Sequence, residues 1–254
     1  MQDDGKPVGV YTLGRFALVR DGRPLAFSGK TPHKPLELLQ ALIALGGRDV
    51  STTLLGRAVW PEEDSADPRN LFDNTLHRLR SLLGYRDAVV LSDAKLSLNP
   101  QRCWVDAWAF DRLAGIRLGD ANTADTASAA DALRLYQGHF LQREAPRSWL
   151  LGYRERLHNR FARLLRCEGE RLESQLRWDA AGEWYERGLE IDPLAENLHQ
   201  RLMICHRNRG EDADALRVYR SCRELLWRAF GVAPSPATEA IARAITITCR
   251  APPP

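Results

Sequence analysis

The chain has 254 residues, of which 44% are hydrophobic and 27% are charged, and its formal net charge is +3. This length and composition are typical of a globular protein with one large domain or two ordinary ones. No window approaches about 18 consecutive apolar residues, and the acidic start Met1–Gly5 lacks the apolar run of a secretory signal, so we expect no membrane partner. Because the net charge is small, any binding to nucleic acid must depend on a local cluster of basic groups.

The five cysteines are scattered, odd in number and without the spacing of a metal site, which indicates reduced thiols in a cytoplasmic protein. The six histidines show no metal spacing with cysteines or carboxylates, and the chain contains no Gly-x-Ser-x-Gly sequence. The sequence therefore predicts no catalytic residue, no metal and no cofactor, and a protein that is not an enzyme.

The N-terminal part begins with β structure. Residues 8–19 are apolar with partial alternation, residues 20–23 form a turn, and residues 24–27 resume a strand. After a polar connection, short helices are expected at 36–45 and 52–60. The second of them is expected to bury the side that contains Leu54, Leu55, Ala58, Val59 and Trp60.

A longer helix is predicted between Asp67 and Gly84. Asp67 can cap its N-terminus, Pro68 suits the first helical position, and Gly84 suits a left-handed exit. Its apolar face contains Leu71, Phe72, Thr75, Leu76, Leu79, Leu82 and Leu83. Its opposite face contains Asn70, Asp73, Asn74, His77, Arg78 and Ser81. Because Asn, His and Arg side chains hydrogen-bond to base edges and phosphates, we interpret this segment as a DNA recognition helix.

Two short strands, 88–91 and 95–98, flank the turn 92–94 and form a hairpin. The predicted order of strands, three helices and a hairpin is that of a winged helix-turn-helix, an α+β domain that we place at residues 1–100. Residues 99–102 are the expected junction to the rest of the chain, and Asp106 is expected to cap the next helix.

From Val105 onward the sequence predicts helices and no strand. The expected helices are 105–118, 124–135, 150–176, 180–191, 194–208, 213–230 and 236–245. Residues 180–185 align with 214–219 at an offset of 34, the period of tetratricopeptide repeats, and residues 130–136 echo 213–219 out of register. We therefore expect residues 101–254 to form an all-α, tetratricopeptide-like domain that leaves a concave surface for a partner.

The N-terminal part resembles the bacterial antibiotic-regulatory activators. The residues that carry this resemblance are Leu13–Phe16, Asp21-Gly22, Lys34–Leu39 and Arg78–Leu83, the last of which also resembles the recognition helix of response-regulator winged helices. The C-terminal part resembles the bacterial transcriptional activator domain through Trp104–Phe110, Pro193–Glu196 and Gly231–Pro236. Together these segments extend over roughly residues 8 to 247.

The resemblance implies a cytoplasmic activator that binds double-stranded promoter DNA, often at direct repeats, and helps to recruit RNA polymerase. Many relatives carry further domains, but this chain has no phosphate-binding loop of the GxxxxGK[ST] type, so it is either a short member or part of a longer regulator. Alignment with the response-regulator recognition helix implies DNA contacts by Asn70, Asn74, Thr75, His77 and Arg78, of which the helical wheel independently selects all but Thr75. Lys95, at the hairpin tip, suits the DNA backbone or minor groove.

Two interpretations stay open for the C-terminal part. Arg156, Arg160 and Arg163 recur at helical spacing, and this basic stripe either pairs with neighbouring acids or binds an anionic ligand or acidic partner. The whole chain is either a DNA-binding regulator, with two protomers forming a homodimer on repeated sites, or a protein-interaction or anionic-ligand-sensing scaffold whose winged helix does not bind DNA. The helical domain would dimerise, receive a signal or contact polymerase.

Overall fold

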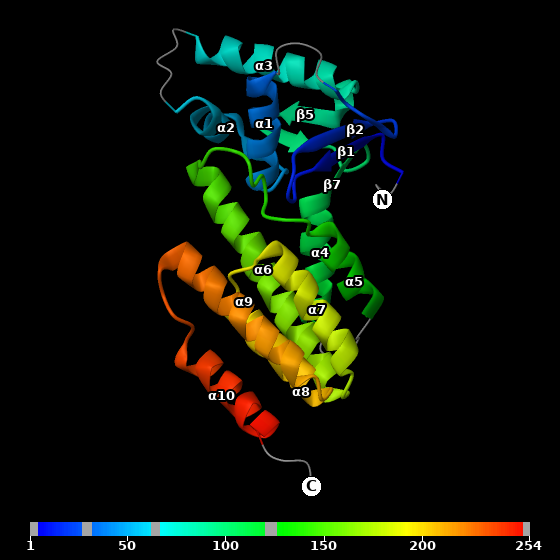
Figure 1. The fold of residues 1–254 in the computed structure, drawn as a ribbon. Helices are drawn as coiled ribbons and strands as arrows, with labels where there is room; N and C mark the ends of the chain where they lie inside the picture. Colours follow the sequence, from blue (N-terminus) through cyan, green and yellow to red (C-terminus); the bar gives the residue numbers. More distant parts are fainter. Residues whose placement is uncertain (1–4, 27–31, 62–66, 120–125, 251–254) are drawn as a thin grey trace. The chain divides into compact units, whose positions relative to one another are not determined.

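The computed structural model describes residues 5–26, 32–61, 67–119 and 126–250 (Figure 1). The chain divides into two units, one formed by Met1–Ile116 and Asp125–Arg160 and the other by Arg117–Ala124 and Phe161–Pro254. The end of the strand expected at 24–27, part of the connection before the first helix, and the start of the helix expected at 124–135 lie outside the described residues. No described helix combines the length and apolar composition needed to cross a membrane.

The first unit contains a sheet with the strand order β3-β2-β1-β7. β1 (Val8–Tyr11) pairs antiparallel with β2 (Ala17–Arg20) and parallel with β7 (Cys103–Val105), and β3 (Arg23–Pro24) lies at the edge. The single strand expected over residues 8–19 is therefore wrong, because the chain turns between Tyr11 and Ala17. Gly14 in that turn has φ +86°, and its backbone packs so closely on Gln137 that an added Cβ would lie 2.8 Å from the Gln137 carbonyl oxygen.

β7 was not expected, and Val105 ends this strand rather than beginning a helix. Its three residues are too few to show a period of two in the sequence, and they become a strand because their backbone pairs with β1 across the chain. The boundary between residues 100 and 101 stays a prediction.

Three helices lie between β3 and the predicted hairpin: α1 (His33–Ala44), α2 (Thr52–Val59) and α3 (Pro68–Leu83). α1 packs against both α2 and α3 through side chains that are fully buried, among them Leu38, Leu39 and Leu42. The burial expected for Leu54 is wrong, since 48% of this residue is exposed while Leu55 is fully buried. An eight-residue helix that packs on one side buries a narrow stripe, here Leu55 and its i+4 neighbour Val59.

The hairpin prediction is confirmed. β5 (Val89–Ser92) and β6 (Lys95–Leu98) pair antiparallel, and β4 (Val50–Ser51) joins the other side of β6 to complete a second sheet. Asp93 and Ala94 both have positive φ (49° and 56°), as a two-residue turn between right-twisted strands requires. A short 3-10 helix, η1 (Arg86–Ala88), connects α3 to the hairpin.

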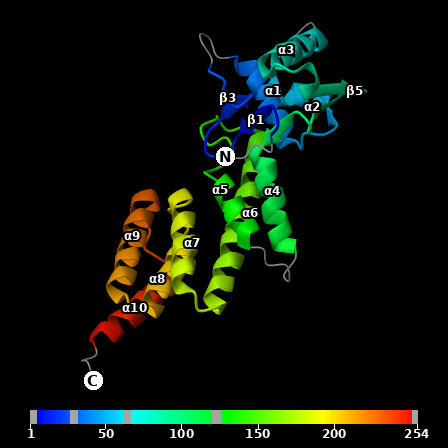
Figure 2. The same cartoon turned by 90° about the vertical axis from the view of Figure 1, so that its right-hand side faces the viewer.

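The remaining elements are helices, as expected. They are α4 (Asp106–Gly119), α5 (Thr126–Leu135), α6 (Ser148–Ser174), α7 (Trp178–Ile191), α8 (Glu196–Asn208), α9 (Asp212–Phe230) and α10 (Pro236–Arg250). In the second unit α8 packs against α7 and α9, and α10 packs against α9 and α8 (Figure 2). Met203, Ala215, Ala242 and Ile245 form a buried cluster there. The fold is thus mixed, with small N-terminal sheets followed by helices.

A buried carboxylate joins the first sheet to α4. Asp106, at the start of α4, accepts hydrogen bonds from the backbone N–H groups of Thr12 (2.8 Å) and Leu13 (2.9 Å) and from the Thr12 hydroxyl (2.6 Å). It also accepts a bond from the N–H of Ala107, the next residue of α4 (2.7 Å). Burial raises the pKa of Asp106 from 3.8 to about 6, although these hydrogen bonds act in the opposite direction.

We predict that Asp106→Asn lowers the free energy of unfolding by about 2–3 kcal/mol near pH 5, because an amide N–H₂ then faces backbone donors. The raised pKa means that the folded chain keeps a proton that the unfolded chain has lost. Its contribution to the free energy of unfolding of wild type is full below about pH 4 and disappears as the pH rises through about 6. The difference in unfolding free energy between wild type and variant should therefore shrink from pH 4.5 to 7.5. Urea unfolding at several pH values measures it, and a difference that does not change with pH would contradict the assignment.

Gly84→Ala should destabilise the fold by about 1–2 kcal/mol, because Gly84 has φ +82° and an added Cβ would lie 2.8 Å from Cδ of Arg20. Gly56→Ala is the matched control. Gly56 lies inside α2 with no atom within 4 Å of an added Cβ, so this change should stabilise by up to about 1 kcal/mol. Equal effects of the two changes in thermal unfolding would contradict this account.

Candidate nucleic-acid interface

Local signals define both ends of α3. The Asp67 side chain accepts a hydrogen bond from the Asn70 N–H (3.0 Å), and the N–H of the left-handed Gly84 donates to the Arg80 carbonyl (3.0 Å). Between these ends the helix buries Phe72, Thr75, Leu76, Leu79 and Leu83 and packs on α1. This packing fixes which side chains face away from the unit.

The opposite face of α3 presents Asn70, Asn74, His77 and Arg78, all of which are exposed. The Asn74 amide donates to the Asn70 side-chain oxygen (2.9 Å), so the two amides are held together and keep outward donor and acceptor groups. Within the described part of the chain, no carboxylate lies within ion-pair distance of the Arg78 guanidinium. Arg78 therefore presents a planar fork of donors that fits guanine O6 and N7 or a phosphate.

Thr75 does not share this face. Only 5% of Thr75 is exposed, and its hydroxyl donates to the Leu71 carbonyl (2.9 Å) one turn earlier in the same helix. The contact that the family resemblance implied for Thr75 is therefore not available in this structure, and we leave Thr75 out of the proposed contacts.

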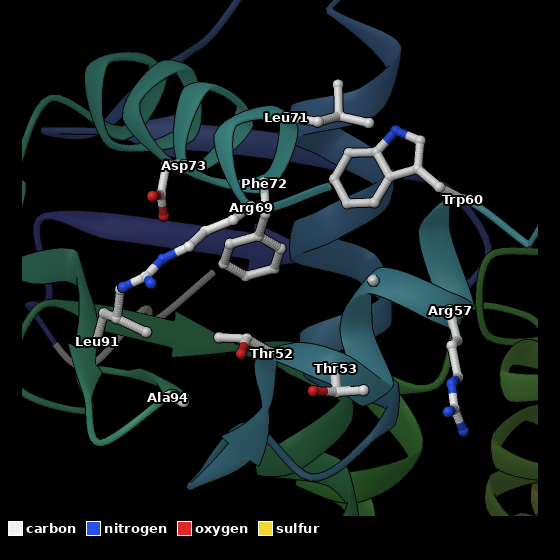
Figure 3. Close-up of a pocket in the computed structure, with 11 residues that line it drawn as sticks. Thr52, Thr53, Arg57, Trp60, Arg69, Leu71, Phe72, Asp73, Leu91 and Ala94 are labelled. Carbon is white, nitrogen blue, oxygen red and sulfur yellow. The ribbon is translucent and has the colours of Figure 1, made fainter. Parts of the chain in front are cut away.

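The flank of α3 that faces the hairpin has mixed chemistry. Arg80 donates from Nε to the Val89 carbonyl (3.0 Å), so it connects α3 to β5 within the unit. Arg69 and Asp73 line a cavity of about 630 Å³ between α2, α3 and the hairpin, together with Phe72 and Leu91 (Figure 3). In Figure 3 the Arg69 side chain extends toward Leu91.

A smaller hollow of about 450 Å³ lies at the C-terminal end of α3. His77, Arg80, Ser81, Gly84 and Arg86 line it, so two guanidinium groups and an imidazole surround it without a carboxylate among these described lining residues. This composition suits a phosphate of the DNA backbone. Arg86 was not predicted as a contact from the sequence, because it lies beyond Gly84, the residue that ends the helix. A basic residue shortly after a proposed recognition helix is a signal that could have identified it.

Lys95 is the first residue of β6, next to the hairpin turn. It pairs with Ser92 across the turn and with Ser51 of β4, and the neighbouring Ala94 carbonyl accepts from the Thr52 N–H (2.9 Å). Ala94 and Leu91 line the same 630 Å³ cavity as Arg69 and Asp73 of α3. Lys95 is exposed and suits a second, separate backbone contact.

The arginines expected to form a basic stripe are engaged differently. Arg160 donates from Nη1 to the Asp111 carboxylate (2.7 Å) and to the Asp111 carbonyl (2.9 Å). Arg156 lies over the Tyr153 ring and 3.9 Å from Asp111, whereas Arg163 belongs to the second unit and is exposed. For Arg156 and Arg160, the structure shows the alternative in which the stripe pairs with neighbouring acids.

One group of potential metal ligands occurs among the described residues. Ligand atoms of His206, Glu211 and Asp214 lie within 4.8 Å of one another at the turn between α8 and α9. His206 already hydrogen-bonds Glu211 (2.9 Å), which lowers the pKa of that carboxyl, and Arg209 and Arg217 form ion pairs with Glu211 and Asp214. Because two guanidinium groups neutralise these acids, we assign no metal to this group.

Comparison with known proteins identifies a matching family and a similar solved structure. The family model described as "Bacterial transcriptional activator domain" matches residues 105–246. Among solved structures the chain is similar to Mycobacterium tuberculosis EmbR in complex with a low-affinity phosphopeptide, with a TM-score of 0.62 and 21% sequence identity. The similarity covers 96% of this chain and 66% of that chain, so the present chain spans just under two thirds of the length of that relative. No curated protein matches this chain.

The likeness to EmbR, at 21% identity, establishes the fold alone. The family model covers more than half of the chain and describes transcription regulators, which confirms the prediction that the chain is not an enzyme. The resemblance stated from the sequence is likewise confirmed. The chain belongs to the bacterial transcriptional activator domain family.

Proposed function

We propose that this chain is a sequence-specific, DNA-binding transcriptional activator of the cytoplasm whose helix α3 enters the major groove of double-stranded promoter DNA. The observation that carries this proposal is the exposed face of α3, on which Asn70, Asn74, His77 and Arg78 lie together. A winged helix-turn-helix presents this face of its third helix to base edges.

Each side chain of the face has a chemical role in the proposed complex. Arg78 donates two hydrogen bonds to a guanine, and Asn70 or Asn74 pairs with the N6 and N7 edge of an adenine. Because Asn74 is hydrogen-bonded to Asn70, the two amides are already oriented before DNA binds. His77 and Arg86 both line the hollow at the C-terminal end of α3. His77 therefore lies between the residues that we propose to read bases and Arg86, which we propose to contact a phosphate.

The modest charge of the chain limits affinity for a single site. Arg86 beside α3 and Lys95 on the hairpin supply two backbone contacts, and the whole chain carries a net charge of only +3. We therefore propose that two protomers bind repeated sites as a homodimer, since linking two weak contacts raises the overall affinity.

The helical domain takes the remaining roles in this proposal. We place the winged helix at residues 1–100 and the helical domain at 101–254, which contains the whole family match. The 34-residue offset between α7 and α9 supports a tetratricopeptide-like stack, which would dimerise, receive a signal or contact RNA polymerase. The scaffold alternative draws its main support from the modest net charge of the chain. The ion pairs of Arg156 and Arg160 with Asp111 do not favour the anionic ligand that this alternative also allows.

We predict that Arg78→Ala weakens binding to a selected DNA site about 5- to 150-fold, which corresponds to about 1–3 kcal/mol for one bidentate base contact. Fluorescence anisotropy with the site chosen from a random DNA library measures this change. Arg134→Ala is the matched control, because Arg134 is also exposed but pairs with Asp131 on α5. Unchanged affinity of the Arg78 variant would contradict the proposal.

Arg86→Ala should weaken binding to every sequence by a similar factor and reduce the slope of log affinity against log salt by about 0.9, because one phosphate contact is lost. The measurement is a salt series with selected and random duplexes. A variant that keeps the wild-type salt slope, or that changes base preference, would show that Arg86 does not contact phosphate.

A further inference from the structure

Helix α7 of the second unit carries a stripe of carboxylates. The exposed residues Asp179, Glu183, Glu186 and Glu190 are spaced by four, three and four positions, so they lie on one face of the helix. Asp179 pairs with Arg209, and Glu190 pairs with Arg187. Among the described residues Glu183 and Glu186 have no cation within ion-pair distance, so this acidic face is only partly neutralised.

Helix α9 carries the opposite chemistry. Arg220 and Arg223 are exposed, and they are followed on the same side by Trp227 and Phe230, which are 66% and 64% exposed. Arg223 lies over the Tyr219 ring, whereas Arg220 has no carboxylate within ion-pair distance among the described residues. Exposed aromatic side chains beside arginines are the typical composition of the centre of a protein interface.

The two stripes share one equivalent position on their helices. α7 and α9 align at an offset of 34, which matches the buried Ala181 with Ala215 and places Glu186 where α9 has Arg220. Both helices pack against α8, and Figures 1 and 2 show them running beside each other in the second unit. The acidic and the basic stripe are therefore directed toward the same side of the unit.

We propose that a second copy of this chain docks on this surface, with α7 of each copy over α9 of the other. A two-fold axis that runs between the two helices and along them produces this arrangement and uses the same surface twice. Arg220 then lies level with Glu186 of the opposite copy, and Trp227 lies level with Leu194, a residue that is 36% exposed. The inference rests on the proposed function, because this surface would join the two protomers of the DNA complex. The association of the protomers can be tested without DNA.

Charge complementarity selects this occupant over others. A nucleic acid would be attracted by Arg220 and Arg223 but repelled by the carboxylates of α7 and by Glu224 on α9. An acidic peptide of another protein would leave the stripe on α7 without a partner. A second copy places the acidic stripe of each chain against the arginines of the other and covers Trp227 and Phe230. Glu190 and Glu224 are then level with each other, but each already pairs with an arginine of its own helix, Arg187 and Arg228.

The experiment is a complementary charge reversal in the full chain, measured by sedimentation velocity without DNA. Wild type should form a dimer. Arg220→Glu with Arg223→Glu, and separately Glu183→Arg with Glu186→Arg, should each weaken the dimer at least about tenfold, because like charges then face each other. An equimolar mixture of the two variants should restore the dimer, because each reversed stripe then meets its complement. Circular dichroism and thermal unfolding verify that both variants fold.

The matched control reverses two exposed arginines of α6 in the same unit, Arg163→Glu with Arg166→Glu. This variant should dimerise like wild type and should not restore the Glu183→Arg, Glu186→Arg variant on mixing. Trp227→Ser should also weaken the dimer. A wild type that stays monomeric, or a mixture of the two reversed variants that does not associate, would overturn the proposed surface. If the same chain still binds its DNA site, the proposed function stands without this surface.

Discussion

The carboxylate of Asp106 joins two parts of the first unit that are distant in sequence. It accepts hydrogen bonds from Thr12 and Leu13, which belong to the turn between β1 and β2, and from Ala107 at the start of α4. Burying a carboxylate is unfavourable unless its oxygens are hydrogen-bonded, and here both oxygens are. The residual cost appears as the raised pKa of this group. The bonds hold the end of β1 beside the end of β7, so the sheet and the following helix form together.

This constraint extends to the proposed DNA-binding helix. The turn held by Asp106 leads into β2, whose Arg20 donates to the Leu82 carbonyl (3.4 Å) near the end of α3. Just after β2, Asp21 accepts a hydrogen bond from the Tyr85 hydroxyl (2.6 Å), and this bond raises the pKa of Tyr85. The C-terminal end of α3 is thus attached to the first sheet, and Arg80 attaches it to the hairpin. These contacts determine where the exposed face and the hollow beside Arg86 lie.

Much of this arrangement could be predicted from the sequence where the cause is local. α3 has its capping residue, its terminating glycine and its apolar stripe within one segment, so its limits and its two faces could be derived. The strand β7, the turn at Gly14 and the bonds between Asp106 and Thr12 could not, because each depends on residues that are far apart in the chain. The buried side of α2 was predicted too broadly for the same reason, since its partners determine which residues of a short helix are covered.

The central claim is that the exposed face of α3 recognises a DNA sequence. Sequencing of DNA selected by the full protein from a random library tests it directly, with wild type and Arg78→Ala in parallel. The account predicts that wild type enriches a repeated motif and that Arg78→Ala loses the preference at one base pair of each repeat. A wild type that enriches no motif, or a variant that enriches the same motif with the same preference at every position, would contradict it.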